Sequence, residues 1–431
     1  MEQLVELEQK AILVGVNLND QEDFAYSMEE LANLADACEV EVVGTLSQNL
    51  PKVNPSHYIG TGKIQEVTAL LEGNGGNLVI FNDELSPSQI RNLESELKCK
   101  VIDRTILILD IFARRAKTRE AQLQVEVAQL KYMLPRLVGL RESLGRQGGG
   151  VGTKNRGVGE TKLELDRRRI EEKITMLSKE LEALVAHRQI QRKQRKKNDI
   201  PVVSLVGYTN AGKSTIMNAM LDTYNPSSQE KQVFEKDMLF ATLETSVRSI
   251  PLQDNKSFLL TDTVGFVSKL PHHLVKAFRS TLEEVAEADL LIHVVDYANP
   301  EFERLIQITN ETLKEIGVTD IPTIYAYNKS DLTEHHIPEV QGDKVYMAAK
   351  SRIGISELVE QIRRQIFKDY IRCTMLVPYD QGTVVSYLNE HANIIETSYE
   401  EEGTKLYMEC RLSDYGKYKQ FVIGGAGKQS E

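Results

Sequence analysis

Short apolar runs alternate with segments of helical periodicity from the N-terminus to Arg104. Residues 22–37 and 86–97 have helical spacing. Four runs predict strands: AILVGVNL (11–18), VEVVGTL (40–46), NLVIFND (77–83) and CKVIDR (99–104). Because strands that alternate with helices build parallel sheets, the pattern predicts an α/β domain, which we bound at residues 1–112.

Between Thr105 and Lys197 the strands stop and two apolar seams with 4-3-4-3 spacing follow each other. The seams consist of Leu123, Val127, Leu130, Leu134 and Leu137, and of Ile170, Ile174, Leu177, Leu181 and Leu184. They predict an antiparallel helical hairpin over residues 113–198. Pro135 should kink or end the first helix near its tip.

The loop predicted between these helices, Gly145 to Glu160, holds seven glycines together with Arg146, Lys154 and Arg156. A flexible linker is one interpretation. The other is a loop that becomes ordered on nucleic acid, because glycine lets the backbone approach phosphates while the cations neutralise them.

The rest of the chain returns to an α/β pattern from Pro201 to about Lys368, which predicts a second α/β domain over residues 199–368. The last segment, 369–431, predicts a small α+β domain. Its runs are MLVPYD, TVVSYLNEHA, NIIETSYEE and TKLYMECRL, in the order strand, helix, strand, strand.

A phosphate-binding loop is predicted where the strand VVSLVG runs into Gly207-x4-Gly212-Lys213-Ser214 and then into a helix. In such a loop, amide groups and the helix N-terminus surround a β-phosphate, Lys213 reaches β- and γ-phosphate oxygens, and Ser214 ligates Mg²⁺. The predicted nucleotide-binding residues here are Gly207, Tyr208, Thr209, Asn210, Ala211, Gly212, Lys213, Ser214 and Thr215.

Two further segments follow in the order that a nucleotide switch requires. The strand SFLLTD delivers Asp262 to its C-terminal end, where the carboxylate can hold Mg²⁺ through water, and Gly265 offers its N–H to a γ-phosphate. Between the loop and Asp262, Thr242 is predicted to close onto the metal only while the γ-phosphate is present. The predicted contact residues are Phe240, Ala241, Thr242, Leu243, Asp262, Thr263, Val264 and Gly265; Lys213, Thr242 and Gly265 are the predicted catalytic residues.

The segment Asn328-Lys329-Ser330-Asp331 predicts which base the bound nucleotide carries. The Asp331 carboxylate can accept two hydrogen bonds from the edge that guanine has and adenine lacks, which selects GTP and GDP over adenine nucleotides. Ala348, Ala349 and Lys350 complete the pocket, with the Ala349 N–H predicted to donate to guanine O6. Alanine at position 348 replaces the usual serine.

Composition and charge narrow the class of partner. The chain of 431 residues is 41% hydrophobic and 27% charged, no apolar run approaches the roughly 20 residues of a membrane span, and the acidic start MEQLVELEQK is no secretory signal, so we expect a cytoplasmic protein. Cys38, Cys99, Cys373 and Cys410 are predicted to be reduced thiols.

The net charge of the chain is −11, but the stretch 104–197 has 23 basic and 11 acidic residues. Such a block favours a polyanion partner, although its run Arg192–Lys197 also suits a merely solvated helix.

The motifs resemble the HflX family of GTPases over almost the whole chain. Beyond the nucleotide motifs, the resemblance lies in NPSHYIGTGKIQEV (54–67), NDELSPSQIRNLE (82–94), DRTILILDIFARRAKTREAQLQVEVAQL (103–130) and GVGETKLELDRRRI (157–170). It implies an N-terminal parallel-sheet domain, the helical hairpin, a P-loop GTPase domain with a central mixed sheet and the small C-terminal domain. It also implies association with the large (50S) ribosomal subunit and its rRNA, through the hairpin and N-terminal domain, and splitting or rescue of stalled or dormant ribosomes. The chain itself is expected to be a monomer.

One position departs from Ras-like GTPases. Phe266 follows Asp262-Thr263-Val264-Gly265, where those enzymes place the glutamine that orients the attacking water. Slow intrinsic turnover that depends on a partner is therefore expected. Asn210 either holds a K⁺ ion that supplies the missing charge or simply braces the loop.

Two other functions remain open from the sequence. A GTP-gated RNA- or ribosome-binding regulator would make hydrolysis incidental, and Phe266 keeps that possibility open. An ATP-driven RNA-remodelling enzyme lacks a second phosphate loop, since Gly60-Thr61-Gly62-Lys63 is too short. The histidines His272, His273, His335 and His336 read as loop residues and not as catalytic bases or metal ligands.

Overall fold

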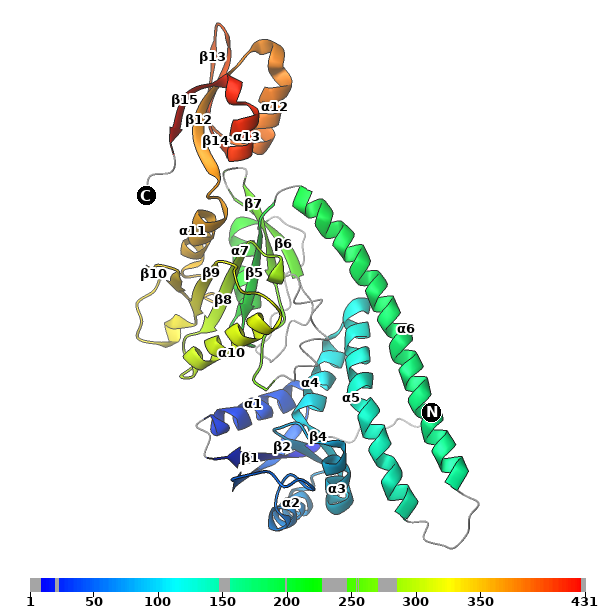
Figure 1. The fold of residues 1–431 in the computed structure, drawn as a ribbon. Helices are drawn as coiled ribbons and strands as arrows, with labels where there is room; N and C mark the ends of the chain where they lie inside the picture. The colour runs from blue at the N-terminus through cyan, green and yellow to red at the C-terminus, as the bar shows by residue number, and fades with distance from the viewer. Residues whose placement is uncertain are drawn as a thin grey trace, which may run out of the picture. The chain divides into compact units, whose positions relative to one another are not determined.

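The computed structural model describes residues 9–19, 23–146, 156–197, 200–226, 246–252, 254, 256–269 and 285–427, with the backbone alone at 137–146, 156–163, 187–197 and 425–427. The chain divides into two compact units. The first comprises residues 1–194, 236–244 and 264–282; the second comprises 195–235, 245–263 and 283–431. Figure 1 shows the elements of both.

The first unit begins with a four-stranded parallel sheet in the order β2-β1-β3-β4. Its strands are β1 (Lys10–Leu18), β2 (Glu41–Leu50), β3 (Leu78–Phe81) and β4 (Lys100–Asp103), joined by helices α1 (Phe24–Ala37), α2 (Thr61–Asn74) and α3 (Pro87–Leu97). The predicted parallel α/β domain is confirmed. Helix α3 starts where the sequence places it, with a capping box between Ser86 and Gln89. Helix α2 was not predicted, since its apolar positions are sparse.

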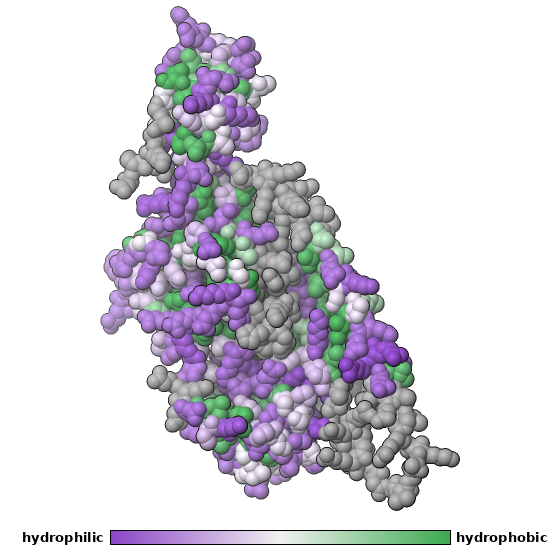
Figure 2. All heavy atoms as spheres, in the orientation of Figure 1, coloured by the Kyte–Doolittle hydropathy of each residue, from purple (hydrophilic) through white to green (hydrophobic). Residues whose placement is uncertain are grey.

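Helices α4 (Arg104–Arg115), α5 (Arg119–Arg146) and α6 (Arg156–Lys197) complete this unit. The seam of α5 and α6 packs as predicted, with Leu123, Val127 and Leu177 buried among Leu130, Leu181 and Leu184. Partly exposed ion pairs of Arg119 with Glu180 (2.8 Å) and of Lys173 with Glu126 (2.6 Å) follow the antiparallel direction of the two helices. On the face shown in Figure 2, hydrophilic side chains with a few hydrophobic ones among them cover the described part of α6.

Helix α5 continues through Pro135 to Arg146, so of the two predicted outcomes, a kink or an end, the end does not occur. One boundary of the predicted hairpin is corrected. Helix α6 begins at Arg156 and includes residues 157–160, which the sequence assigned to the glycine-rich loop. The remaining loop residues, 147–155, lie outside the described ranges.

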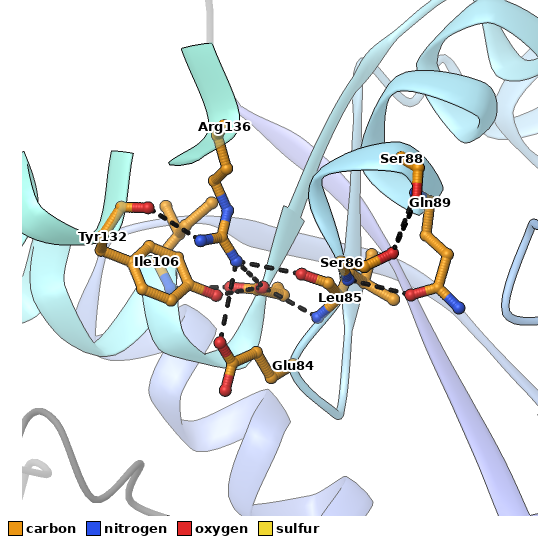
Figure 3. Close-up of polar contacts among 9 residues, drawn as sticks. Glu84, Leu85, Ser86, Ser88, Gln89, Ile106, Tyr132 and Arg136 are labelled. Atoms are coloured by element: carbon orange, nitrogen blue, oxygen red, sulfur yellow. Dashed lines mark hydrogen bonds and ion pairs between the residues drawn. The ribbon is translucent and has the colours of Figure 1, made fainter. Parts of the chain in front are cut away.

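A buried carboxylate ties helix α5 to the N-terminal sheet (Figure 3). Asp103, at the end of β4, is fully buried. Its Oδ1 accepts the Ile106 N–H at 3.0 Å and so caps helix α4, while Oδ2 accepts the Leu85 N–H at 3.0 Å and the Tyr132 hydroxyl at 2.5 Å. Arg136 lies over the Tyr132 ring and donates to Asp103 as well, at 3.3 Å. The middle of α5 is therefore fixed to the sheet by one acidic residue.

The second unit contains a seven-stranded mixed sheet in the order β10-β11-β9-β8-β5-β7-β6. Strands β5, β7, β8, β9 and β11 run parallel, whereas β6 and β10 pair antiparallel with β7 and β11. The strands are β5 (Val202–Gly207), β6 (Ser246–Pro251), β7 (Ser257–Asp262), β8 (Leu290–Asp296), β9 (Thr323–Asn328), β10 (Glu339–Gln341) and β11 (Lys344–Tyr346). The helices are α7 (Lys213–Tyr224), α10 (Phe302–Glu315) and α11 (Ile355–Ile366). The expected mixed sheet is confirmed.

The chain ends in a four-stranded antiparallel sheet with a βαββαβ connection and the order β13-β14-β12-β15. Its elements are β12 (Tyr370–Val377), α12 (Gly382–His391), β13 (Asn393–Glu400), β14 (Gly403–Arg411), α13 (Leu412–Lys417) and β15 (Val422–Gly427). The sequence predicted this α+β class but missed α13 and β15. Adjacent strands bring the sulfurs of Cys373 and Cys410, distant in sequence, to 3.6 Å.

Candidate functional site

The loop between β5 and α7 depends on two glycines. Gly207 has a φ of +143°, and a Cβ there would lie 2.3 Å from the Val294 carbonyl oxygen. Gly212 has a φ of +97°, and a Cβ there would lie 2.1 Å from Asn328 Nδ2. Because both positions combine unusual backbone conformation with no room for a side chain, the loop geometry requires glycine.

Lys213, the first residue of α7, is buried inside this loop. Its Nζ donates to the carbonyl oxygens of Gly207 at 3.1 Å and Tyr208 at 2.8 Å. Burial lowers the pKa of Lys213 to about 8, partly opposed by the negative charge of Asp262. The Lys213 ammonium group is therefore enclosed in the loop. A bound phosphate would add negative charge beside it and favour its protonated form.

The other side chains of the loop are mostly enclosed. Tyr208, Thr209 and Ala211 are buried, and the Thr209 hydroxyl has no hydrogen-bond partner among the described residues. Asn210 is exposed and has a φ of +61°. A buried hydroxyl without a protein partner and an amide presented to solvent suit a loop that closes around an anion.

Strand β7 brings Asp262 beside the start of α7. The parallel register places Asp262 opposite Leu205, and Ser214 Oγ donates to Asp262 Oδ2 at 2.6 Å. The next residue, Thr263, donates its hydroxyl to the Leu205 carbonyl at 2.7 Å. A hydroxyl and a carboxylate in contact form a hard oxygen donor set of the kind Mg²⁺ takes in nucleotide sites.

Asn328 joins the loop to the predicted base pocket. Its Nδ2 donates to the Ala211 carbonyl at 2.9 Å, and its Oδ1 accepts the Ala349 N–H at 2.9 Å. The Ala349 N–H was predicted to donate to guanine O6; in the structure it already donates to Asn328, so a bond to the base would have to share or replace that contact. Ala348 and Ala349 are buried and Lys350 is exposed.

The remaining base-pocket residues follow strand β9. Lys329, in left-handed conformation, makes a 2.8 Å ion pair with Asp296 at the end of β8. Ser330 is buried and donates to the Tyr327 carbonyl, which fixes the turn. The Asp331 side chain is exposed, so its carboxylate is available to a ligand.

The remaining predicted residues fall into two groups. Phe240, Ala241, Thr242, Leu243, His272 and His273 lie outside the described residues. Gly265 and Phe266 are buried and are grouped with the first unit. In that unit Ser268 accepts a 3.0 Å hydrogen bond from Arg104 and donates to Glu30, and Lys269 pairs with Asp83 at 2.6 Å.

Three family models match successive parts of the chain. They are described as GTP-binding GTPase N-terminal (residues 25–113), GTP-binding GTPase Middle Region (115–195) and 50S ribosome-binding GTPase (202–329). The chain is 44% identical to the GTPase HflX of Caldanaerobacter subterraneus over 98% of this chain and 96% of that protein. It is 38% identical to the GTPase HflX of Escherichia coli K12 over 94% and 93% of the two chains.

The chain belongs to the HflX family of GTPases. It therefore binds guanine nucleotide and hydrolyses GTP, as the motifs predicted. A GTP-binding protein from Sulfolobus solfataricus, solved in complex with GDP, is 24% identical, with a TM-score of 0.44 over 83% of this chain and 99% of that one.

The HflX chain has two residues near the nucleotide motifs that sequence reasoning missed. His293 lies on β8 opposite Val206; burial lowers its pKa to about 4, with the positive charge of Lys213 as the lesser cause, so the imidazole is neutral near pH 7. Asp296 holds Lys329. A lone histidine in the apolar run LLIHVVD and a strand-terminal aspartate were the available signals.

No described helix has an apolar stretch of membrane-spanning length.

The excess of basic residues in 104–197 is unevenly distributed. Between Glu164 and Ala186, the described side chains of α6 include five basic and six acidic residues. The local excess therefore lies in the flanking parts of 104–197.

Proposed function

We propose that this GTPase binds the large ribosomal subunit and couples GTP binding and hydrolysis to the splitting or rescue of stalled or dormant ribosomes. The observation that carries the proposal is the match of residues 202–329 to the 50S ribosome-binding GTPase family beside a block with 23 basic and 11 acidic residues. An rRNA surface is a polyanion of the kind that such a block would bind.

The roles of the parts follow from this proposal. Residues 1–112 and 113–198 form the ribosome-binding domains, 199–368 the nucleotide domain and 369–431 the C-terminal domain, all in a cytoplasmic monomer. The hairpin tip (137–163) and the end of α6 (187–197) together hold 11 basic and 2 acidic residues and would make the rRNA contacts. The middle of α6 (164–186), whose described side chains include five basic and six acidic residues, would act as a spacer between these contacts.

The nucleotide chemistry is assigned to the predicted residues. Gly207 to Thr215 would hold the phosphates and Asn328 to Asp331 the base, while Ser214 and Thr242, with Asp262 through water, would hold Mg²⁺. The contact of Ser214 with Asp262 supports this donor set. Bound Mg²⁺ would neutralise charge on the β- and γ-phosphates. The exposed amide of Asn210 is a candidate K⁺ ligand, and equal turnover in K⁺ and Na⁺ at matched ionic strength would exclude that role.

The test is steady-state GTP hydrolysis by the full-length chain with and without purified large subunits. Phe266 cannot orient water, so stimulation by at least about tenfold is expected if the ribosome completes the site. Lys213→Ala should abolish turnover in both conditions and serves as the background control. Light scattering of 70S particles then measures splitting. A chain that binds GTP but shows no stimulation would contradict the proposal.

Phe266 also supports a second candidate, a GTP-gated ribosome-binding regulator whose hydrolysis is incidental. A GTP analogue that cannot be hydrolysed distinguishes the two. If hydrolysis serves release, the analogue should trap the chain on the large subunit after one round of splitting. A regulator would act through repeated rounds with the analogue.

A further inference from the structure

The turn between β6 and β7 carries two charged residues whose side chains are nearly buried. The exposed fraction of the side chain is 4% for Lys256 and 12% for Asp254. The Leu252 N–H donates to the Lys256 carbonyl at 2.8 Å and closes the turn. A buried ammonium is costly unless it is paired, so its partners determine where this turn can lie.

Those partners belong mainly to the C-terminal domain. Lys256 Nζ lies 2.8 Å from Glu409 Oε2 on β14, and the Glu409 side chain is only 4% exposed. The same ammonium lies 4.5 Å from the ring centroid of Tyr370 on β12 and 3.3 Å from Asp254, which in turn pairs with Arg363 of α11 at 2.6 Å. We call Lys256, Asp254, Glu409 and Arg363 the turn clamp.

The opposite end of the same hairpin lies at the nucleotide site. Strands β6 and β7 pair without a register shift from Pro251 opposite Ser257 to Ser246 opposite Asp262. Asp262, the last residue of β7, contacts Ser214. At about 3.3 Å per residue, the six residues of β7 span about 20 Å between the clamp and Asp262. The paired strands therefore form one continuous element that links the clamp to the nucleotide site.

We propose that Lys256 and Glu409 are positioning residues through which the C-terminal domain and the nucleotide site are coupled. The clamp favours one position of the β6–β7 hairpin, and the nucleotide that suits this position binds more tightly. Binding free energies are reciprocal, so the nucleotide must alter the stability of the clamp by the same factor. The proposal rests on the guanine-nucleotide site and not on ribosome binding.

The first experiment measures amide hydrogen exchange in the purified full-length chain with GDP and with a GTP analogue that cannot be hydrolysed. Exchange in 370–377 and 403–411 should differ between the two nucleotides. Identical exchange in these strands, with differences confined to residues around 207–215 and 328–331, would overturn the proposal. No ribosome is present, so failure of the ribosomal function would leave this result unaffected.

The second experiment measures Kd for both nucleotides in Glu409→Gln, Lys256→Met and the double variant. Coupling of ordinary strength changes the ratio of the two Kd values by about fivefold or more in each single variant. The double variant removes both buried charges, so it should fold even if a single variant, left with one unpaired charge, does not. In the double variant, the hydrogen exchange of the C-terminal strands should no longer differ between GDP and the GTP analogue.

Glu400→Gln is the matched control, because it breaks an ion pair with Lys405 that is also in the C-terminal sheet but is partly exposed. Its Kd ratio should equal that of the unmodified chain. If the clamp variants also keep that ratio within about twofold while remaining folded, the clamp is purely structural and the proposal is wrong.

Discussion

The Tyr132 hydroxyl lies 2.5 Å from Asp103 Oδ2, which connects the fourth turn of helix α5 to the last residue of strand β4. Burial raises the pKa of Tyr132, and the negative charge of Asp103 raises it further, so the hydroxyl remains a donor. The position of the helical hairpin on the N-terminal sheet therefore depends on a buried polar contact as well as on its apolar seam.

Tyr132→Phe should destabilise this connection. The substitution removes a hydrogen bond to a buried carboxylate, which contributes about 1.5–3 kcal/mol. Urea unfolding followed by a probe in the first unit would measure the loss. Tyr399→Phe, at a residue 77% exposed, is the control and should be neutral. Equal stability of the two variants would show that Arg136 and Leu85 suffice to hold Asp103.

Nucleotide affinity should weaken as pH rises through about 8. The pKa of Lys213 is about 8 in the protein without ligand, and bound phosphate should raise it because it favours the ammonium. Below this pH the lysine is protonated in both states, and the affinity is insensitive to its titration. Above it, binding must take up a proton, so the Kd for GDP should increase by up to about tenfold per pH unit.

Titration calorimetry from pH 7 to 9 measures this dependence. Lys213→Arg keeps a cation that does not titrate in the range, so its affinity profile should be flatter. A profile in the arginine variant as steep as in the unmodified chain would assign the pH dependence to the nucleotide instead of to Lys213.

Gly212→Ala should disrupt the loop and the base pocket together. The new Cβ would lie 2.1 Å from Asn328 Nδ2 at a φ of +97°, so the contact of Asn328 with Ala211 would be displaced. GDP binding should weaken by about tenfold or more, since backbone strain of this kind costs roughly 1–3 kcal/mol. Gly73→Ala, in helix α2 with open space around it, should instead leave binding unchanged and slightly increase stability.

Asp331→Asn should change base selectivity. In the predicted base pocket the exposed carboxylate would accept two hydrogen bonds from guanine that the asparagine amide can only partly replace, so GTP affinity should fall by up to about 10⁴-fold. Xanthine nucleotides, which present an acceptor where guanine presents its amino group, should gain relative affinity. Competition binding measures both. Asp320→Asn, at an exposed loop position, is the control, and an unchanged GTP:XTP ratio in the Asp331 variant would refute the assignment.

The sequence predicted those parts of the fold whose signals are local. The phosphate loop needs two glycines and a lysine at fixed spacing, and strands such as β1, β3, β5 and β8 are nearly continuous apolar runs. Helix α2 was missed because it buries only Ile64, Val67 and Leu71, too few positions to produce a clear helical period. At Pro135 the sequence left a kink and a helix end open, and the structure excludes the end, because the helix continues to Arg146.

The parts of the site that depend on distant pairs could not be predicted. Asp296 meets Lys329 only because β8 and β9 are neighbours, and Lys256 meets Glu409 across 153 positions of sequence. Neither pair has a spacing rule. The HflX motifs indicated where the nucleotide binds, but the contacts that support those motifs required the assembled sheets.

Asn328 has a consequence for the synthesis of the chain. It joins Ala211, 117 positions earlier, to Ala349, 21 positions later. During translation the phosphate loop emerges long before either of the segments that complete the pocket, and a chain interrupted between them has the glycine loop but no closed base pocket. Guanine-nucleotide recognition therefore waits until residues through Ala349 have been made, so a chain truncated before that point should not retain the nucleotide.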